Sequence, residues 1–319
     1  MNAVEIKNLS KNFGPKQAVC GLDMTVPMGA IYGFIGENGS GKSTLLNAML
    51  GEKISIISRK PQTTRNRIIG IHTVGDDQYV FLDTPGIFKP QNSLGDFMVK
   101  TANSTMQEGD MVILVADAGY RPDDVEEGII AYLKKSGTPA ILALNKVDLY
   151  RREQIAETIA AYAAAHNFEA VVPISAQKGK YVDEVLDECS KLLREGEWFY
   201  DEDMITDQPQ RQMVAEIIRE KILRTLDKEI PHGVAIVVEE YRDEGSIVRI
   251  RAEIFCEKAS HKGILVGKNG ETLKRIGSYA REDMEKLLDA QVYLNLWVKV
   301  KENWRESAAA VSNFGYKPE

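Results

Sequence analysis

The chain has 319 residues, of which 44% are hydrophobic, enough for two globular domains with separate cores. Its formal net charge of −7 argues against a protein that coats nucleic acid over its whole surface, although a total can conceal a local basic patch. No apolar run reaches the roughly 18 residues of a membrane span, and the N-terminus lacks the apolar core of a signal peptide. We therefore expect a cytoplasmic protein.

The cysteines do not indicate disulfides or a metal site. Cys20, Cys189 and Cys256 are odd in number, far apart in the sequence and without metal-ligand spacing. We expect three reduced thiols that pack as small hydrophobic side chains.

A phosphate-binding loop follows the first short apolar run. Residues 30–35 predict a buried strand that ends at a glycine, and residues 43–50 predict a helix. Between a strand and a helix, glycines let backbone N–H groups converge on phosphates, while Lys42 supplies charge and the Ser43 hydroxyl reaches a metal ion. The expected phosphate-binding residues are Gly36, Asn38, Gly39, Ser40, Gly41, Lys42, Ser43 and Thr44.

Two later segments supply oxygen atoms of the kind that bind Mg²⁺. The predicted strand of residues 79–82 ends at Asp83, and the loop after it can approach the outermost phosphate. Thr64 offers a second hydroxyl, held only while a triphosphate is intact, although a plain loop threonine is the alternative. The metal ligands are thus predicted to be Ser43, Thr64 and Asp83. The loop residues beside them are Thr84, Pro85 and Gly86.

The next two strands end at residues that select guanine. Residues 140–144 lead into Asn145, Lys146 and Asp148, a pattern in which the aspartate accepts two N–H groups that adenine cannot present. Residues 171–174 lead into Ser175 and Ala176, whose backbone would contact the base carbonyl. The expected ligands are therefore GTP and GDP.

A second domain is predicted after an acidic and aromatic linker at residues 195–210. Val214, Ile218 and Ile222 form one face of a helix, and alternating hydrophobicity predicts three half-buried strands at residues 234–241, 248–256 and 292–300. We place this domain at residues 211–304, the preceding nucleotide domain at residues 30–194, and a C-terminal tail at residues 305–319.

The second domain carries a Gly-X-X-Gly loop before a helix predicted at residues 271–288. Such a loop lets a nucleic-acid backbone approach closely, and Ile264, Val266 and Ile276 are expected to form the floor of the groove. Residues 258–275 hold five basic residues against Glu271, so the basic patch lies here. A simple turn is the alternative. The predicted RNA-binding residues are Lys262, Ile264, Val266, Gly267, Lys268, Asn269, Gly270, Lys274 and Arg275.

From about residue 45 to the C-terminus the sequence resembles the Era family of bacterial GTPases. The resemblance rests on residues 51–56, 60–65, 83–86, 217–221 and 296–301. It implies an α/β P-loop NTPase domain of the Ras-like kind followed by an α+β type II KH domain. It also implies binding of the 3′ end of small-subunit ribosomal RNA during assembly of the small ribosomal subunit, with GTP favouring the RNA-binding state. We expect a protein that is mostly monomeric, and we leave open peripheral contact with the inner face of the cell membrane.

Residues 1–45 do not fit that family and resemble the start of an ABC-type ATPase. Residues 4–14 resemble its opening strand, and residues 36–44 resemble its phosphate loop. We expect residues 1–29 to form an extra β-hairpin against the edge of the sheet. Phe13, at the place of an adenine-stacking aromatic residue, is expected to pack instead, because the guanine site lies on later loops.

One departure from the Era family, and one feature that the resemblance shares with it, bear on catalysis. The Era family has asparagine three residues before the loop lysine, where it is implied to help hold K⁺; here that residue is Gly39, and Asn38 precedes it, so a K⁺ cofactor is in question. Ile87 stands where Ras-type enzymes carry a water-orienting glutamine, which predicts slow intrinsic hydrolysis. Catalysis is then expected from Lys42, Mg²⁺ and backbone N–H groups, with Thr64 ordering the loop that positions water.

Two other functions remain as alternatives. An ABC-type ATPase fragment is disfavoured because Asp83 is followed by threonine rather than glutamate, and because no Leu-Ser-Gly-Gly-Gln sequence occurs. An RNA-binding protein with an impaired nucleotide domain is the second alternative, since the unusual N-terminus could disturb the phosphate loop.

Overall fold

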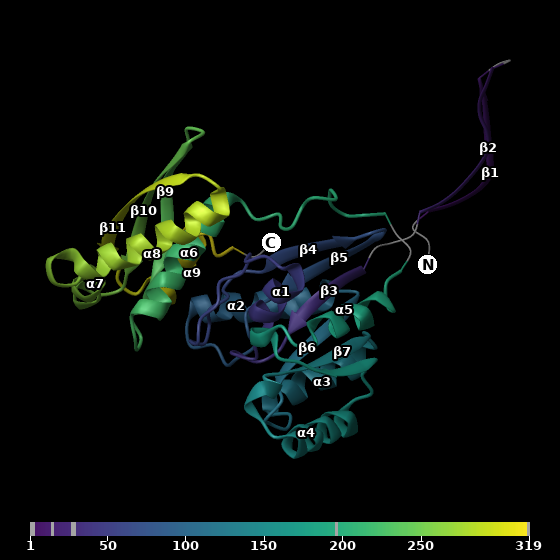
Figure 1. Cartoon of the computed structure of the whole chain (residues 1–319), viewed down its shortest axis with the longest axis horizontal. Helices are drawn as coiled ribbons and strands as arrows, with labels where there is room; N and C mark the ends of the chain where they lie inside the picture. Colours follow the sequence, from purple (N-terminus) through teal and green to yellow (C-terminus); the bar gives the residue numbers. More distant parts are fainter. Residues whose placement is uncertain (1–3, 14–15, 27–29, 195–196, 318–319) are drawn as a thin grey trace.

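The computed structural model describes residues 4–13, 16–26, 30–194 and 197–317, with side chains from residue 30 onward. Two domains lie side by side, one built from α1 to α5 and the other from α6 to α8 (Figure 1). None of the described helices is both long enough and apolar enough to cross a membrane.

The first domain is a six-stranded sheet in the order β4-β5-β3-β6-β7-β8, in which only β4 is antiparallel to its neighbour. Apolar side chains cover both faces of the sheet, and helices on each side bury the central strands. One face packs against α1 and α5, and the other against α3 and α4. This is the expected Ras-like fold. The strands are β3 (Ala30–Ile35), β4 (Ile68–Val74), β5 (Asp77–Asp83), β6 (Met111–Asp117), β7 (Ala140–Asn145) and β8 (Ala170–Pro173). The helices are α1 (Lys42–Leu50), α2 (Ser93–Glu108), α3 (Asp124–Ser136), α4 (Arg152–Ala165) and α5 (Val182–Ser190).

The second domain has the expected three strands, in the order β11-β10-β9, with β10 parallel to β11 and antiparallel to β9. Helices α6 and α8 bury their apolar faces against one side of this sheet, where Ile218, Ile276 and Met284 are fully buried. The sequence predicted α8 correctly. The elements are α6 (Gln210–Thr225), β9 (Ala235–Asp243), β10 (Ile247–Cys256), α7 (Ala259–Val266), α8 (Glu271–Leu288) and β11 (Gln291–Val300).

The linker between the domains follows the edge strand β4 and the turn that joins it to β5. The backbone N–H of Ile71 donates to the carbonyl of Ile205 at 2.7 Å, and the Trp198 indole donates to the carbonyl of Asp76 at 3.0 Å. The Gln78 side chain accepts backbone N–H groups from Phe199 and its neighbour. The linker thereby covers unpaired strand groups that would otherwise be open to another chain.

The C-terminal segment is more than the tail that the sequence suggested. A short 3-10 helix (Trp304–Glu306) and α9 (Ala308–Asn313) lie between the two domains. Trp304 and Tyr316 are buried in a cluster with Phe97 of α2 and Ala235 of β9. The aromatic residues of this segment therefore join α2 of the first domain to the sheet of the second.

The N-terminal hairpin is present, with β1 (Val4–Phe13) antiparallel to β2 (Lys16–Val26). Its expected pairing with the edge of the main sheet is wrong: β1 and β2 form a two-stranded sheet of their own. The linker already occupies the β4 edge. The side chains of Phe13 and Cys20 lie outside the described residues. Of the other cysteines, Cys189 and Cys256 are buried free thiols, as expected.

Trp304 tests the packing between the domains. Its side chain is fully buried and its indole donates to the carbonyl of Gly233 at 2.9 Å. We expect Trp304→Ala to lower the free energy of unfolding by about 3–5 kcal/mol, because it opens a cavity and leaves the Gly233 carbonyl without this hydrogen bond. Urea unfolding followed by circular dichroism measures the loss. Trp297→Ala, at a side chain 58% exposed, is the matched control and should change stability by less than about 0.5 kcal/mol. Equal losses for the two variants would contradict the assignment.

Candidate nucleotide pocket and RNA groove

The predicted nucleotide residues meet in one cavity of about 1220 Å³ at the carboxyl ends of the central strands. The predicted residues that line it are Asn38, Gly39, Gly41, Lys42, Ser43, Thr44, Thr64, Thr84, Gly86, Asn145, Lys146, Asp148, Ser175 and Ala176. Gly36, Ser40, Asp83 and Pro85 are buried beside it. Leu223 and Asp227, from the second domain, also line the cavity, which the sequence did not indicate.

The phosphate loop needs its glycines for backbone shape and for space. Gly36, Gly39 and Gly41 have φ angles of +151°, +85° and +103°, a range that side chains disfavour. A Cβ on Gly41 would lie 2.2 Å from Nδ2 of Asn145, so this glycine also lets the base-recognition loop approach. Asn145 in turn donates to the carbonyl of Ser40 at 2.8 Å. The phosphate and base ends of the pocket are thus braced against each other.

Lys42 lies at the centre of the loop and is buried. Its Nζ donates to the carbonyls of Gly36 and Glu37 at 2.9 and 3.0 Å. Burial lowers the pKa of Lys42 to about 8, an effect that the nearby Asp83 and Glu37 carboxylates partly offset. A phosphate bound in this loop would therefore stabilise the protonated, charged form of Lys42, which burial alone disfavours.

The three predicted metal ligands lie together. Ser43 Oγ is 2.8 Å from Thr64 Oγ1 and donates to Asp83 Oδ2 at 2.5 Å. Asp83 Oδ1 is buried without a hydrogen-bond partner among the described residues, and burial raises the pKa of this carboxyl group. Hard oxygen donors around one buried carboxylate suit Mg²⁺, which keeps several waters and takes few protein ligands. Among the described residues, no group of three or more His, Cys, Asp or Glu is placed to hold a metal ion. Ser55, which the sequence analysis missed, also donates to Asp83 at 3.1 Å.

The base-recognition end is assembled as predicted. Asn145 Oδ1 accepts the backbone N–H of Lys146 and of Ala176 at 2.8 and 2.9 Å. Asp148 Oδ1 accepts the Ser175 hydroxyl at 2.6 Å, which orients the carboxylate towards a base. The sequence did not indicate Asp117, which pairs with Lys146 at 2.8 Å and fixes the lysine stem beside the base site.

Asn38, one position before the asparagine place of the Era pattern, contacts both loops that flank the γ-phosphate position. Its Oδ1 accepts the backbone N–H of Gln62 at 3.3 Å, and a Cβ on Gly86 would lie 2.4 Å from the same oxygen. The shifted asparagine thus lies between the loop before β4 and the loop after β5. Whether K⁺ has a role here stays a prediction.

The Gly-X-X-Gly loop lies between α7 and α8, as predicted. Gly267 has φ of +75°, and a Cβ there would lie 2.3 Å from Thr272 Oγ1. Asn269 adopts φ of +52°, a conformation that asparagine tolerates better than most residues. Lys268 and Asn269 project from the turn as exposed side chains.

A groove of about 380 Å³ runs from this loop between α8 and β11. Its lining residues are Gly270, Leu273, Lys274, Gly277, Ser278, Arg281, Leu294 and Leu296. The prediction that Ile276 forms the floor is wrong, since this side chain is fully buried beneath α8. Ile264 and Val266 lie on α7, outside the lining of this cavity, and their role in RNA binding stays a prediction. The apolar lining of this cavity comes from Leu273 on α8 and from Leu294 and Leu296 on β11, which pair only in the folded domain.

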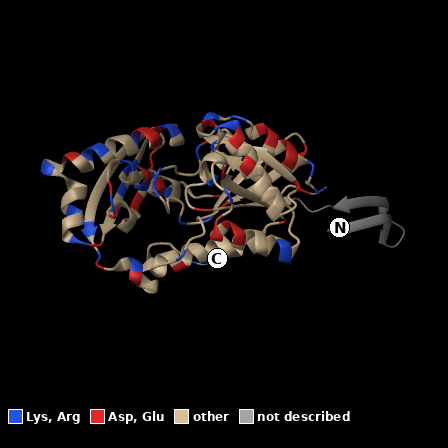
Figure 2. Ribbon diagram, turned by 90° about the horizontal axis from the view of Figure 1, so that it is seen from below, with Lys and Arg blue, Asp and Glu red and all other residues tan. Residues whose placement is uncertain are grey.

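Three other predicted RNA-binding residues lie on or between the two helices that flank the loop. Lys262 and Arg275 are exposed on α7 and α8, and Gly267 precedes the turn. Figure 2 shows basic residues at the end of the second domain that is farthest from the first domain. Of the basic patch that the sequence predicted, Lys274 lines the groove itself.

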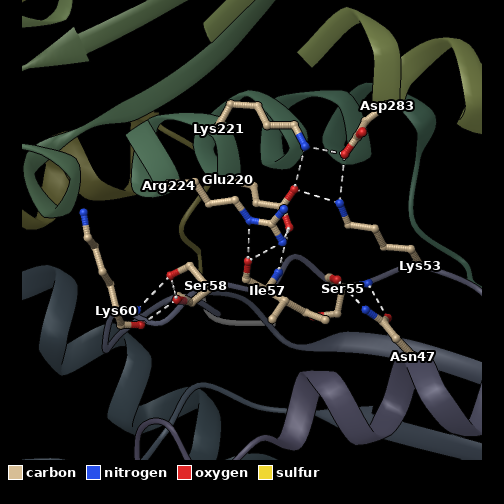
Figure 3. Close-up of polar contacts among 11 residues, drawn as sticks. Asn47, Lys53, Ser55, Ile57, Ser58, Lys60, Glu220, Lys221, Arg224 and Asp283 are labelled. Atoms are coloured by element: carbon tan, nitrogen blue, oxygen red, sulfur yellow. Dashed lines mark hydrogen bonds and ion pairs between the residues drawn. The ribbon is translucent and has the colours of Figure 1, made fainter. Parts of the chain in front are cut away.

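The two domains are tied together beside the C-terminal end of α1 (Figure 3). Lys53, just after α1, bonds to Glu220 of α6 at 2.7 Å and to Asp283 of α8 at 3.0 Å, and Lys221 also pairs with both carboxylates. Burial alone would raise the pKa of Glu220, but the bonds from Lys53 and from the N–H of Ile57 hold it below its ordinary value. The helix that carries the RNA loop is thus linked by charge to the nucleotide domain.

Comparison with known proteins agrees with this geometry. A family model described as 50S ribosome-binding GTPase matches residues 31–146, and a KH domain model matches residues 229–305. The Era GTPase of Ruminiclostridium cellulolyticum is 46% identical over 284 residues, which is 89% of this chain and 95% of that protein. The Era GTPase of Clostridioides difficile is 47% identical over 285 residues, which is 88% of this chain and 96% of that protein.

Two solved Era structures have the same fold. A variant of Aquifex aeolicus Era bound to GDP and AlF₄⁻ superposes with a TM-score of 0.88 and 37% identity, covering 92% of this chain and 100% of that one. Era in complex with MgGDPNP and nucleotides 1506–1542 of 16S ribosomal RNA gives a TM-score of 0.88 and 37% identity, covering 91% of this chain and 100% of that one.

The fold and the pocket define a P-loop GTPase that carries a KH domain. At these identities over nearly the whole length of its relatives, the chain belongs to the Era family of GTPases. The GTPase family match includes residues 36–44, the loop whose sequence resembles an ABC-type loop. The origin of residues 1–29 stays a prediction.

Asp148 tests base recognition. We expect Asp148→Asn to weaken GTP binding about a hundredfold, because it removes a charged acceptor from the base, and to favour xanthosine triphosphate, whose altered edge suits an amide. Calorimetric titration of both nucleotides measures the change. Unchanged preference for GTP would contradict the assignment.

Lys42 predicts a pH-linked binding reaction. With its pKa lowered to about 8, the free protein loses this proton above pH 8, whereas a bound triphosphate should return the pKa towards its ordinary 10.5. GTP binding at pH 9 should therefore take up a proton, and binding at pH 7 should take up almost none. The same shift makes the nucleotide-free fold gain stability as pH rises from 8 to 10.5, since the unfolded chain then binds more protons. Calorimetry in two buffers of different ionisation enthalpy measures the uptake, and its absence at pH 9 would contradict the assignment.

Proposed function

We propose that this chain binds and hydrolyses GTP with Mg²⁺ and, coupled to this, binds the 3′ end of 16S ribosomal RNA during assembly of the small ribosomal subunit. The observation that carries the proposal is one chain with both a complete guanine-nucleotide pocket and a basic groove behind a Gly-X-X-Gly loop. It is supported by the full-length similarity to Era in complex with MgGDPNP and nucleotides 1506–1542 of 16S ribosomal RNA.

The residues at the metal site define the chemistry that the protein supplies. Mg²⁺ at this site would neutralise charge on the phosphates. Ser43 and Thr64 would each give a hydroxyl, and Asp83 would orient a metal-bound water through its unpartnered oxygen. Lys42 would stabilise charge on the transferred phosphoryl group. The prediction of slow intrinsic hydrolysis follows because Ile87 cannot orient water.

The domain interface supports a coupling in which GTP favours the RNA-binding state. Asp283 lies on α8, the helix that begins at the RNA loop, and it bonds to Lys53 at 3.0 Å beside the nucleotide domain. A rearrangement of either partner would break this partly exposed ion pair and the neighbouring contact of Lys53 with the buried Glu220, which gives the coupling its free energy. A protein that acts on GTP and ribosomal RNA would work in the cytoplasm. Membrane contact, oligomeric state and the proposed domain limits stay predictions.

The two alternatives fit the structure less well. An RNA-binding protein with an impaired nucleotide domain would not need the hydrogen bonds that hold Asp148 and Asn145 against the loop of Ser175. These hydrogen bonds are nevertheless present. An ABC-type ATPase would not use a carboxylate that selects guanine.

The groove is tested by reversing charge at its loop. We expect Lys268→Asp with Asn269→Asp to abolish binding of an RNA covering the 16S 3′ end, because the new charges repel phosphate, and to leave GTP affinity within twofold. Fluorescence anisotropy at two salt concentrations measures RNA affinity. The control is Lys134→Asp with Lys135→Asp on α3, which should leave RNA binding intact. RNA affinity that survives the loop changes would place the groove elsewhere.

A further inference from the structure

The loop that carries Thr64 is held by the second domain along most of its length. The N–H of Ile57 donates to Glu220 at 3.0 Å, and Arg224 donates to the carbonyl of Ile57 at 2.9 Å. Further along the loop, Lys60 donates to the carbonyl of Leu226. Figure 3 shows α6 lying over this segment. A loop that depends on its triphosphate for order is therefore attached to a neighbouring helix.

Arg219 of α6 reaches the residue directly before Thr64. Its side chain has no exposed surface, and its Nη2 donates to the carbonyl of Thr63 at 2.5 Å. Burial disfavours the charge, but the adjacent Glu216, which accepts from Nε at 2.9 Å, keeps the pKa of Arg219 above its ordinary value. The cation is thus fixed in place, and its bond to the loop is made by a charged donor out of contact with water.

Arg65, directly after Thr64, is held from the other side. Its guanidinium donates to the carbonyls of Val234 and His232 at 2.7 and 2.8 Å, and to the Tyr316 hydroxyl at 3.0 Å. It also lies over the Trp304 and Tyr316 rings, 5.9 and 5.7 Å from their centroids. All of these partners belong to the second domain or to the C-terminal segment.

Thr64 therefore lies between two residues that the second domain fixes. Its own Oγ1 points back into the pocket, 2.8 Å from Ser43 Oγ. A hydroxyl that binds a metal must be placed within a few tenths of an ångström. A backbone that is already ordered lowers the entropic cost of that placement. Neither Arg219 nor Tyr316 lines the cavity, so both act through Thr64 and its neighbours.

We propose that Arg219, assisted by the Arg65–Tyr316 contact, is a positioning residue for GTP hydrolysis that orders the Thr64 loop from the KH domain. The inference rests on the proposed role of Thr64 at Mg²⁺. GDP does not engage this threonine in switching GTPases, since the loop is released after hydrolysis. Loss of Arg219 should therefore weaken the triphosphate state and spare the diphosphate state.

The test compares three variants of the full chain. For Arg219→Met we expect kcat to fall about tenfold, the effect of one bond from a charged donor, and affinity for Mg-GDPNP to fall by a similar factor. Affinity for GDP should stay within twofold. Tyr316→Phe removes one hydroxyl and should give a smaller loss with the same selectivity. Arg211→Met is the matched control, because Arg211 on the same helix donates to the carbonyls of Val238 and Glu239 within its own domain.

Each outcome decides the inference. A fall in GDP and GDPNP affinity together, or an equal fall for Arg211→Met, would show a merely structural role and overturn it. Unchanged kcat for Arg219→Met would also overturn it. If circular dichroism shows that Arg219→Met is unfolded, the GDPNP and GDP affinities of Tyr316→Phe decide. Thr64→Ala separates the two proposals: if it leaves hydrolysis unchanged, the proposed metal role fails first.

Discussion

The structure depends on the placement of three oxygen donors that come from distant parts of the chain. Ser43 begins a helix, Asp83 ends a strand and Thr64 lies in the loop between them, yet the Ser43 hydroxyl lies within hydrogen-bonding distance of both other side chains. One carboxylate oxygen is left buried and unpartnered, which costs free energy unless a cation is present. The phosphate loop, the position of Lys42 and the order of the Thr64 loop all serve to place a cation and its phosphates beside this oxygen.

The second domain contributes to this placement as much as the sheet does. Helix α6 contacts the Thr64 loop through backbone and side-chain bonds, and the C-terminal segment closes the other side with Trp304 and Tyr316. Buried arginines at such an interface are costly to desolvate, and a movement of either partner leaves a buried charge without its hydrogen bonds. The interface is therefore sensitive to the state of the loop, as a switch requires, and the same domain carries the groove between α8 and β11.

Much of this could be predicted from the sequence, because the informative residues act locally. The glycines before Lys42, the strand ends at Asp83 and Asn145, and the loop before α8 have functions that spacing alone reveals. The lining of the groove could not be predicted, because α8 and β11 are brought together only in the folded domain, where Ile276 is fully buried while Leu273 is partly buried and lines the cavity. Arg65 and Arg219 were missed for a related reason. In the sequence a surface arginine and a buried one look alike, and only the packed interface distinguishes them.

We expect the binding of nucleotide and the binding of RNA to be coupled through the interface between the two domains. The direct measurement is the affinity of the whole chain for GDPNP with and without an RNA of the 16S 3′ end, together with the affinity for that RNA with and without GDPNP. Linkage requires both ratios to be the same, and the account predicts that each ligand strengthens the other at least fivefold, which is about 1 kcal/mol of coupling. Affinities that do not change in either direction would contradict it.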